Sequence, residues 1–275
     1  MAEKSNIEWT DASWTPIRAR NLETGAVGWH CTHVTPGCVN CYSETLNKRL
    51  GTGLEFKPAN AKKIEIFLDE KMLMAPLRWK RGRKIFVCSM TDAFADFVTD
   101  DMLDRMFAVM ALTPHHTFQV LTKRSVRMRG YCSQPEMARR IWRAADMIAC
   151  DFYLKECHPS AAYLNAGSAA APWPLPNVWA GVSTEDQPRA NERIPDLLLT
   201  PAAKRYVSAE PLLGPIDYTR IELGESDATF FGSPEITRAV FSINALTGAR
   251  YTGIPGLDLI ITGYESGPRS RACDV

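Results

Sequence analysis

Three cysteines in one short segment of the chain are the residues best suited to chemistry. Cys31, Cys38 and Cys41 follow the spacing C-x6-C-x2-C. Thiolates this close repel one another unless a metal centre holds them, and three protein ligands leave one coordination position of that centre open. An open position favours chemistry on a bound substrate or cofactor over a purely structural role.

Two kinds of metal centre suit these cysteines. Zinc prefers four Cys or His ligands, and either His30 or His33 can supply the fourth. A structural zinc site usually has two C-x2-C pairs, however, and no second pair follows in this sequence. A [4Fe–4S] cluster on three cysteines instead leaves one iron free, which S-adenosyl-L-methionine can chelate through its amino and carboxylate groups. Because C-x6-C-x2-C is not the C-x3-C-x2-C of most radical S-adenosylmethionine enzymes, both centres stay open.

The elements that must position these cysteines follow a repeating pattern. Apolar runs typical of buried parallel strands occur at residues 84–90, 118–122, 177–183, 205–208 and 257–262. Helical segments alternate with them, so the sequence predicts an α/β fold, either a doubly wound sheet or a (β/α) barrel. Each run ends in hydroxyl and charged residues, and a barrel collects such strand ends at one mouth. We therefore expect a partial (β/α) TIM-type barrel of about six parallel strands, with an N-terminal cysteine loop.

The mouth of this barrel defines the other candidate site residues. They are Ser89, Asp92, Lys123, Arg124, Ser183, Glu185, Glu210 and Glu265. Lys123 and Arg124 suit a carboxylate or phosphate, because they are cations that donate charge-assisted hydrogen bonds. The acids and serines suit ribose hydroxyls or other polar groups. Cys88 is expected as a buried strand residue rather than as a ligand.

Composition and charge bound the class of protein. The 275 residues are 45% hydrophobic and 23% charged, with a net charge of +1, so no global charge indicates nucleic acid or a membrane. The basic run of Arg124, Arg127 and Arg129 is typical of a solvated loop. Eight cysteines without a secretory leader predict reduced thiols in the cytoplasm, and no apolar run reaches the roughly 18 residues that a membrane span requires. We expect a single domain over residues 1–275, with irregular insertions near 157–176 and 215–256.

Longer motifs along the chain resemble a known family. They are residues 7–16 (IEWTDASWTP), 34–42 (VTPGCVNCY), 118–124 (FQVLTKR), 176–183 (PNVWAGVS), 208–214 (SAEPLLG) and 263–268 (GYESGP). In this order they resemble the phage Gp37/Gp68 family, DUF5131, from about residue 5 to 271 outside the insertions. That family looks like a branch of the radical S-adenosylmethionine superfamily. The resemblance implies a partial barrel and cluster ligands at Cys31, Cys38 and Cys41.

The sequence departs from this family in two places. Tyr264 stands where the family usually has the second of two glycines. Family members also usually continue past this motif with a helix and a further strand, whereas this chain ends at Val275. The resemblance therefore implies that the C-terminal strand is missing, which would leave one edge of the barrel open.

Two functions are compatible with these residues. The first is a radical S-adenosylmethionine-type enzyme, supplied with electrons by a donor such as flavodoxin or ferredoxin. Its association with phage suggests a nucleotide or nucleic-acid base as substrate. The alternative is a non-catalytic zinc- or Fe–S-stabilised protein of phage type that binds nucleic acid through its basic residues. A brown, oxygen-sensitive preparation would favour the enzyme, and a colourless protein with tightly held zinc would favour the alternative.

Overall fold

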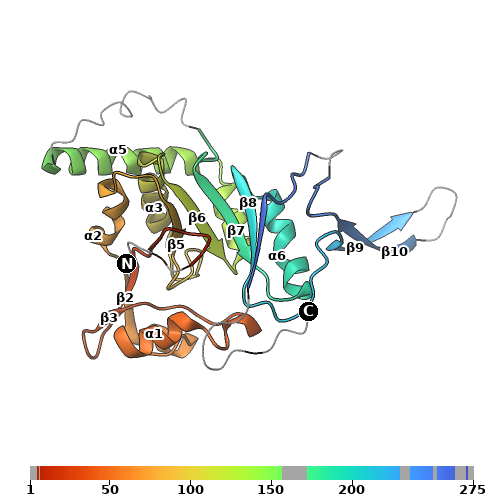
Figure 1. Ribbon diagram of the computed structural model, residues 1–275, viewed down its shortest axis with the longest axis horizontal. Helices are drawn as coiled ribbons and strands as arrows, with labels where there is room; N and C mark the ends of the chain where they lie inside the picture. Colours follow the sequence, from red (N-terminus) through yellow and green to blue (C-terminus); the bar gives the residue numbers. More distant parts are fainter. Residues whose placement is uncertain are drawn as a thin grey trace.

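A six-stranded parallel sheet forms the centre of the structure, a computed structural model that describes residues 5, 7–156, 172–229, 236–249, 253–263 and 271. The strand order is β1-β5-β6-β7-β8-β11 (Figure 1). These strands are β1 (Ala12–Trp14), β5 (Lys84–Val87), β6 (Thr117–Thr122), β7 (Val178–Ser183), β8 (Lys204–Ala209) and β11 (Leu259–Thr262). Every neighbouring pair runs parallel. The prediction of about six parallel strands is confirmed, but within the described residues the sheet is open, with β1 and β11 at its edges.

Helices cover one face of this sheet. They are α3 (Asp100–Leu112), α4 (Ser125–Cys132), α5 (Met137–Glu156) and α6 (Gln187–Leu199). The alternation of side chains along each strand turns Val87, Phe118 and Val182 toward them, into a core that includes Leu103 and Ile194. Burial of this apolar face is the main stabilisation of the sheet.

Side-chain caps define where two of these helices begin. The hydroxyl oxygen of Thr99 accepts a hydrogen bond from the Met102 amide at 3.3 Å, at the start of α3. The carboxylate of Asp186 accepts one from the Arg189 amide at 2.9 Å, at the start of α6. Such caps satisfy amide donors that the first helical turn leaves unpaired, so both helix starts are encoded locally.

The opposite, inner face of the sheet is covered by the N-terminal segment. The ring of Trp9 lies 4.8 Å from Phe86 and 6.4 Å from Tyr206, centroid to centroid. Gln119 donates from Nε2 to the Trp9 carbonyl at 3.3 Å. Gly181 leaves room for Tyr206, because a Cβ at this position would lie 2.4 Å from the tyrosine ring. Helices on one face and a packed segment on the other differ from a doubly wound sheet, which has helices on both faces.

A small antiparallel sheet and a helix hold the cysteine loop. The sheet has the order β3-β2-β4, with β2 (Ile17–Asn21), β3 (Val27–Gly28) and β4 (Ile64–Leu68). The loop continues through a short 3-10 helix, η1 (Pro36–Cys38), into α1 (Tyr42–Leu50). Asn47 of α1 is fully buried, and its Oδ1 accepts from the Trp29 amide at 2.9 Å. In Figure 1, α1 and these strands lie beyond one end of the parallel strands.

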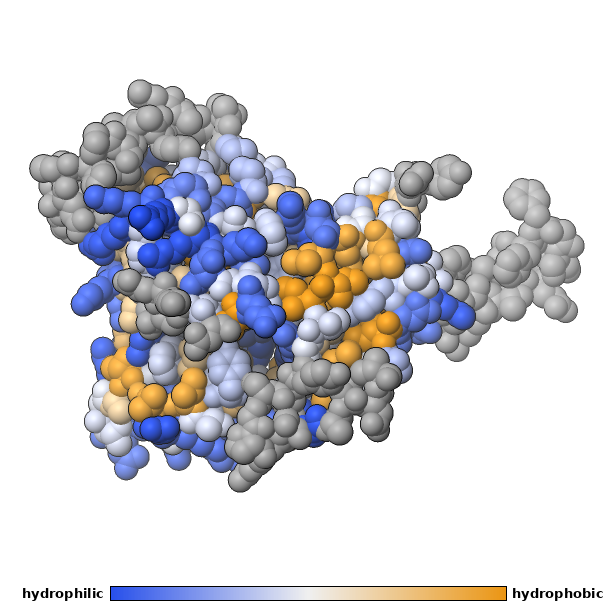
Figure 2. Space-filling view, in the orientation of Figure 1, coloured by the Kyte–Doolittle hydropathy of each residue, from blue (hydrophilic) through white to orange (hydrophobic). Residues whose placement is uncertain are grey.

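Shorter elements complete the fold. They are η2 (Pro58–Lys63), α2 (Glu70–Leu73) and η3 (Ala75–Arg78). Strands β9 (Ile221–Thr229) and β10 (Ile236–Ile243) form an antiparallel pair, which Figure 1 shows projecting from the sheet. They occupy the region near 215–256 that the sequence predicted as irregular; most of the other insertion, residues 157–171, lies outside the described residues. Apolar residues gather near the edge strand β11 (Figure 2), where Leu259 is 37% exposed.

The strand expected at 84–90 is shorter in the structure. It ends at Val87, because Cys88 has a φ of 58°, a left-handed conformation that no strand continues. Cys88 is buried as expected, at 2% exposed, but it begins a turn rather than extending the strand. Strands β2 and β4 were not expected, since their short runs lack the long apolar pattern of the central strands. None of the described helices is both long and apolar enough to cross a membrane.

Candidate functional site

A cavity of about 570 Å³ lies where the parallel strands end and the cysteine loop crosses them. Cys31, Cys38 and Cys41 all line it. So do six of the other predicted residues: Ser89, Asp92, Lys123, Arg124, Ser183 and Glu210. Its volume is within the range of about 300–1,000 Å³ that is typical of small-molecule sites. The carboxyl ends of the strands and the cysteines therefore share one site.

Local turns bring the three cysteines to this cavity. The Cys38 amide donates to the Thr35 carbonyl at 2.9 Å, and the Cys41 amide donates to the Cys38 carbonyl at 3.3 Å. Cys41 is the N-cap residue of α1, and its Sγ lies 2.9 Å from the Ser43 hydroxyl. All three thiols are free and half-buried. The backbone thus turns twice within the loop, and all three cysteines line the same cavity.

The side chains around the cavity allow the two metal hypotheses to be compared. Within the described residues, no three or more Cys, His, Asp or Glu side chains converge into a ready metal-binding group. Neither histidine lines the cavity. The His30 ring packs 6.0 Å from Phe56 and 5.2 Å from Phe97, and burial lowers its pKa to about 4. His33 lies 3.4 Å from the Glu44 carboxylate. The described residues therefore supply no histidine from the cavity wall as a fourth zinc ligand.

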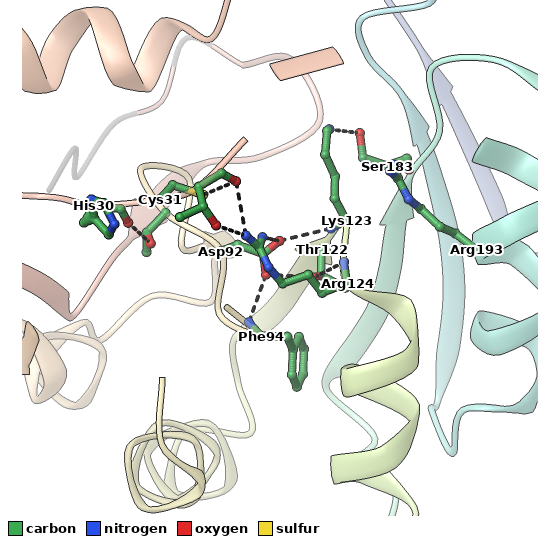
Figure 3. A network of polar contacts seen from close by, with 11 residues as sticks. His30, Cys31, Asp92, Phe94, Thr122, Lys123, Arg124, Ser183 and Arg193 are labelled. Atoms are coloured by element: carbon green, nitrogen blue, oxygen red, sulfur yellow. Dashed lines mark hydrogen bonds and ion pairs between the residues drawn. The ribbon is translucent and has the colours of Figure 1, made fainter. Parts of the chain in front are cut away.

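Asp92 is the hub of the polar wall. Its carboxylate accepts hydrogen bonds from the Thr122 hydroxyl at 2.7 Å and from the amides of Phe94 and Lys123 at 2.9 and 3.1 Å. It also pairs with Nη1 of Arg124 at 2.9 Å, and both side chains are about nine-tenths buried (Figure 3). The carboxylate therefore ties the turn after β5 to the end of β6 and fixes the guanidinium.

Arg124 carries this network into the cysteine loop. Its Nη2 donates to the hydroxyl of Thr32 at 2.7 Å and to the Thr32 carbonyl at 3.1 Å. Two further bonds join the loop to the turn after β5: the Thr91 hydroxyl donates to the His30 carbonyl at 2.5 Å, and the Tyr42 hydroxyl donates to the Ser89 carbonyl at 2.7 Å. The loop is thus held on the sheet by side-chain hydrogen bonds rather than by strand pairing.

The remaining cations and acids form the other wall. Lys123 donates from Nζ to the Ser183 hydroxyl at 2.5 Å, which joins β6 to β7 (Figure 3). Glu210 lies after β8, where its Oε2 accepts from the Ser208 hydroxyl at 3.0 Å. Gly263 approaches Glu210 closely, since a Cβ there would lie 2.3 Å from Oε1. Hydroxyl, ammonium and carboxylate groups therefore face the cavity from four successive strand ends, β5 to β8.

Two predicted residues do not line the cavity. Glu185 is fully buried beneath the loop, where a Cβ on Gly37 would lie 3.0 Å from its Cδ. Its Oε2 pairs with Nη1 of Arg193 at 3.0 Å. The structure therefore places Glu185 under the cysteine loop and not in the cavity wall, where the sequence predicted it. Glu265 lies outside the described residues.

The electrostatics of the site favour a neutral Cys31. Burial raises the pKa of the Cys31 thiol to about 12, the Asp92 carboxylate adds to this rise, and Arg124 opposes it. A thiol with a raised pKa is a poor metal ligand until it loses its proton, so a metal centre bound at Cys31 would have to displace that proton. Burial acts to lower the pKa of the Arg124 guanidinium, but Asp92 and Cys31 outweigh it and raise the pKa, so Arg124 remains a cation beside the Cys31 thiol.

The lining residues that sequence reasoning did not assign to the site include Trp9, Thr32 and Cys88. Trp9 precedes β1, so its position at the inner face follows only from the path of the N-terminal segment. Thr32 shows no signal other than its place beside Cys31. Cys88 had the signal of a buried strand, and its left-handed backbone turns it into the cavity wall.

Comparison with known proteins gives one match. Residues 4–275 match the model of DUF5131, a family described as proteins of unknown function. Searches of curated proteins and of solved structures found no match.

Proposed function

We propose a function from one premise, that the chain belongs to the DUF5131 family. We infer that it is a radical S-adenosylmethionine-type enzyme whose [4Fe–4S] cluster is held by Cys31, Cys38 and Cys41. One observation carries this proposal: the three thiols face a single cavity together with cations, acids and hydroxyls from the ends of parallel strands. Helices on one face of the sheet, with the N-terminal segment on the other, support the partial (β/α) barrel that this class of enzyme requires.

The donor set determines what chemistry the site would have. Cys31, Cys38 and Cys41 would hold the cluster and leave one iron for S-adenosylmethionine, and the cluster would supply the electron for reductive cleavage of the sulfonium. The protein's part is to bind, orient and exclude water. The apolar floor of the cavity, with Trp9, Phe86 and Leu121, suits the last of these tasks.

The polar wall suits the binding of charged ligands. Lys123 and Arg124 are placed to bind a carboxylate or a phosphate, because charge-assisted bonds from cations are stronger than neutral ones. Ser183 and Glu210 are placed to accept or donate hydrogen bonds to hydroxyl groups. Asp92 holds Arg124 in position through the 2.9 Å ion pair, so its role is to orient the cation.

Substrate and partners are part of the proposal. The phage resemblance suggests a nucleotide or a nucleic-acid base as substrate, and reduction of the cluster calls for a donor such as flavodoxin or ferredoxin. Cys31, Cys38 and Cys41 are free, which suits a reducing compartment such as the cytoplasm.

Anaerobic reconstitution of the full chain with iron and sulfide tests the metal site. We expect about four irons per chain in the wild type and a strong loss in Cys38→Ala. Cys150→Ala is the matched control, because Cys150 is also a free thiol but is exposed on α5, and it should bind iron like the wild type. Equal iron in Cys38→Ala and the wild type would sink the cluster proposal.

Activity is tested separately. The reconstituted protein is reduced with dithionite in the presence of S-adenosylmethionine, and 5′-deoxyadenosine is measured by chromatography. Formation of this product that depends on Cys38 supports the enzyme. A colourless chain that holds zinc and forms no 5′-deoxyadenosine would instead support the alternative, a metal-stabilised nucleic-acid-binding protein.

A further inference from the structure

A second hollow lies on the other side of the Lys123–Arg124 segment. It is an open groove of about 670 Å³ between α4 and α6. Val34, Lys123 and Arg124 line both this groove and the cysteine cavity, so only these residues and their neighbours separate the two. A ligand that reaches past them would occupy both hollows.

Cations from two helices line the groove. Arg127 comes from α4, Arg189 and Arg193 come from α6, and Lys123 and Arg124 come from the segment between β6 and α4. The sequence alone indicated a solvated loop for Arg124 and Arg127. The structure instead places Arg127 in a helix, facing the arginines of another helix that is more than 60 residues away in the chain.

Arg127, Arg189 and Arg193 each have an anionic partner, and each also has a nitrogen without a hydrogen bond in the described part of the chain. Arg127 pairs with Asp100 at 3.1 Å, and Arg193 pairs with Glu185 at 3.0 Å. Yet Nε of Arg127, and both Nε and Nη2 of Arg193, are buried without a hydrogen-bond partner among the described residues. Nε of Arg189 also lacks a hydrogen bond, although it lies 3.1 Å from Glu192. These nitrogens are buried, so the groups that face the groove are the exposed parts of Arg127 and Arg189, whose side chains are 32% and 33% exposed. Guanidinium groups accessible along one groove favour an anionic ligand there, because they donate charge-assisted hydrogen bonds.

The charged residues that line the groove and the helix that begins beside it also favour an anionic ligand. The acids that line the groove are Asp96 and Glu192, fewer than its five cations, while Asp100 and Glu185 do not line it. Ser125, Val126 and Arg127, the first turn of α4, also line the groove, and the N-cap residue Arg124 makes no side-chain cap bond. The first amides of a helix attract anions, because they point along the axis without intrahelical acceptors.

We propose that this groove binds the phosphate groups of the substrate, whose reacting unit enters the cysteine cavity. The inference rests on the proposed function and deepens it, because it assigns the substrate to phosphate-bearing nucleotides, free or in a single strand. Guanidinium groups bind phosphate through paired hydrogen bonds. Because the arginines are spread over two helices, they suit a ligand that carries several phosphate groups better than a ligand that carries one carboxylate.

Binding to the full chain purified without iron tests the proposal independently of activity. The probe is a fluorescein-labelled single-stranded oligonucleotide, measured by fluorescence anisotropy at several salt concentrations. Arg127→Gln and Arg189→Gln should each weaken binding about tenfold and make the slope of log K against log salt shallower by about 0.7. Arg105→Gln is the matched control: Arg105 is ion-paired at 2.6 Å with Glu70 and is 30% exposed, close to 32% and 33% for Arg127 and Arg189. It should bind like the wild type.

Competition identifies the source of the phosphate. A mononucleotide that displaces the probe as well as an unlabelled strand does would assign the site to free nucleotides, and stronger displacement by the strand would assign it to nucleic acid. The proposal would be overturned if both arginine variants bound the labelled strand as tightly as the wild type does. It would also be overturned if a nucleoside without phosphate competed as well as a mononucleotide, or if neither the labelled strand nor a mononucleotide bound to the protein. Arg189→Gln alone decides if Arg127→Gln fails to fold. Phosphate binding that depends on these arginines in a chain that takes up no iron would refute the proposed enzyme but leave the groove intact.

Discussion

Two buried carboxylate–guanidinium pairs support the cysteine loop, and they are built differently. The Asp92–Arg124 pair lies in the cavity wall, and Asp92 accepts four hydrogen bonds while Arg124 donates to Thr32. The Glu185–Arg193 pair lies under the loop with side chains 0% and 1% exposed, and two nitrogens of Arg193 have no hydrogen-bond partner among the described residues. The first pair is satisfied, and the second is not.

The two ion pairs therefore differ in whether hydrogen bonds satisfy their buried charges. A buried ion pair stabilises a protein only when hydrogen bonds replace the water that both charges lose. Asp92 meets this condition, so the wall residue Arg124 is held rigidly where a ligand would meet it. Arg193 does not, because two of its buried nitrogens have no hydrogen-bond partner among the described residues, so this pair should contribute less to stability.

The largest expected effect is the loss of Asp92. Asp92→Ala should lower the free energy of unfolding by about 3–5 kcal/mol, because it leaves a buried guanidinium without its anion and leaves the Phe94 and Lys123 amides without an acceptor. Urea denaturation followed by circular dichroism measures this. Asp96→Ala is the control, four residues away and exposed, with an expected change within about 0.5 kcal/mol. Similar stability of the two variants would show that Asp92 is not a hub.

The second prediction separates the two pairs directly. Glu185→Leu should cost about 3–5 kcal/mol, whereas the double variant Glu185→Leu/Arg193→Met should return to within about 1 kcal/mol of the wild type. Apolar replacement removes the unsatisfied nitrogens of Arg193 together with the charge. The double variant Asp92→Leu/Arg124→Met should stay destabilised, because backbone amides and Thr32 lose their partners. Equal recovery in both double variants would contradict the distinction between the pairs.

The pH dependence of the unfolding free energy tests the Glu185–Arg193 pair further, with a smaller expected effect. Burial acts to raise the pKa of Glu185, but Lys123 and Arg193 outweigh it and leave the pKa below the usual 4.5. A carboxyl group with a lowered folded-state pKa stabilises the protein above its unfolded pKa and loses that contribution as the pH falls. The unfolding free energy of Glu185→Gln should therefore fall less than that of the wild type between about pH 7 and pH 3. A steeper fall in the variant would reverse the sign that we assign.

The smallest expected effect tests the link from Arg124 to the loop. Thr32→Val removes the hydroxyl acceptor at 2.7 Å but keeps the carbonyl acceptor at 3.1 Å, so it should cost about 1 kcal/mol. Thr45→Val is the control, because the Thr45 hydroxyl makes only an exposed bond of 3.4 Å to Cys41 and should matter less. A double-mutant cycle with Arg124→Met measures the coupling, which should vanish if Thr32 acts elsewhere.

Part of the site could be predicted because strand ends are a local signal. An apolar run followed by hydroxyl and charged residues marks where a parallel strand leaves the core, and Ser89, Lys123 and Ser183, which the sequence predicted from this signal, line one cavity. Each of these three residues lies within two residues of the end of its strand. Glu185 follows β7 by two residues as well, yet the loop that crosses the sheet covers it.

The sequence by itself determined the cysteine spacing, the parallel strands and the cations at their ends, because these depend on residue type and short-range period. Only the tertiary structure decided which groups share a space. The His30 ring packs against Phe97 instead of lining the cavity with the cysteines. Glu185 lies beneath the cysteine loop, and Arg127 lines the same groove as the arginines of α6. These outcomes depend on contacts between segments far apart in the chain, where packing and the pairing of buried charges, not local pattern, fix each side chain.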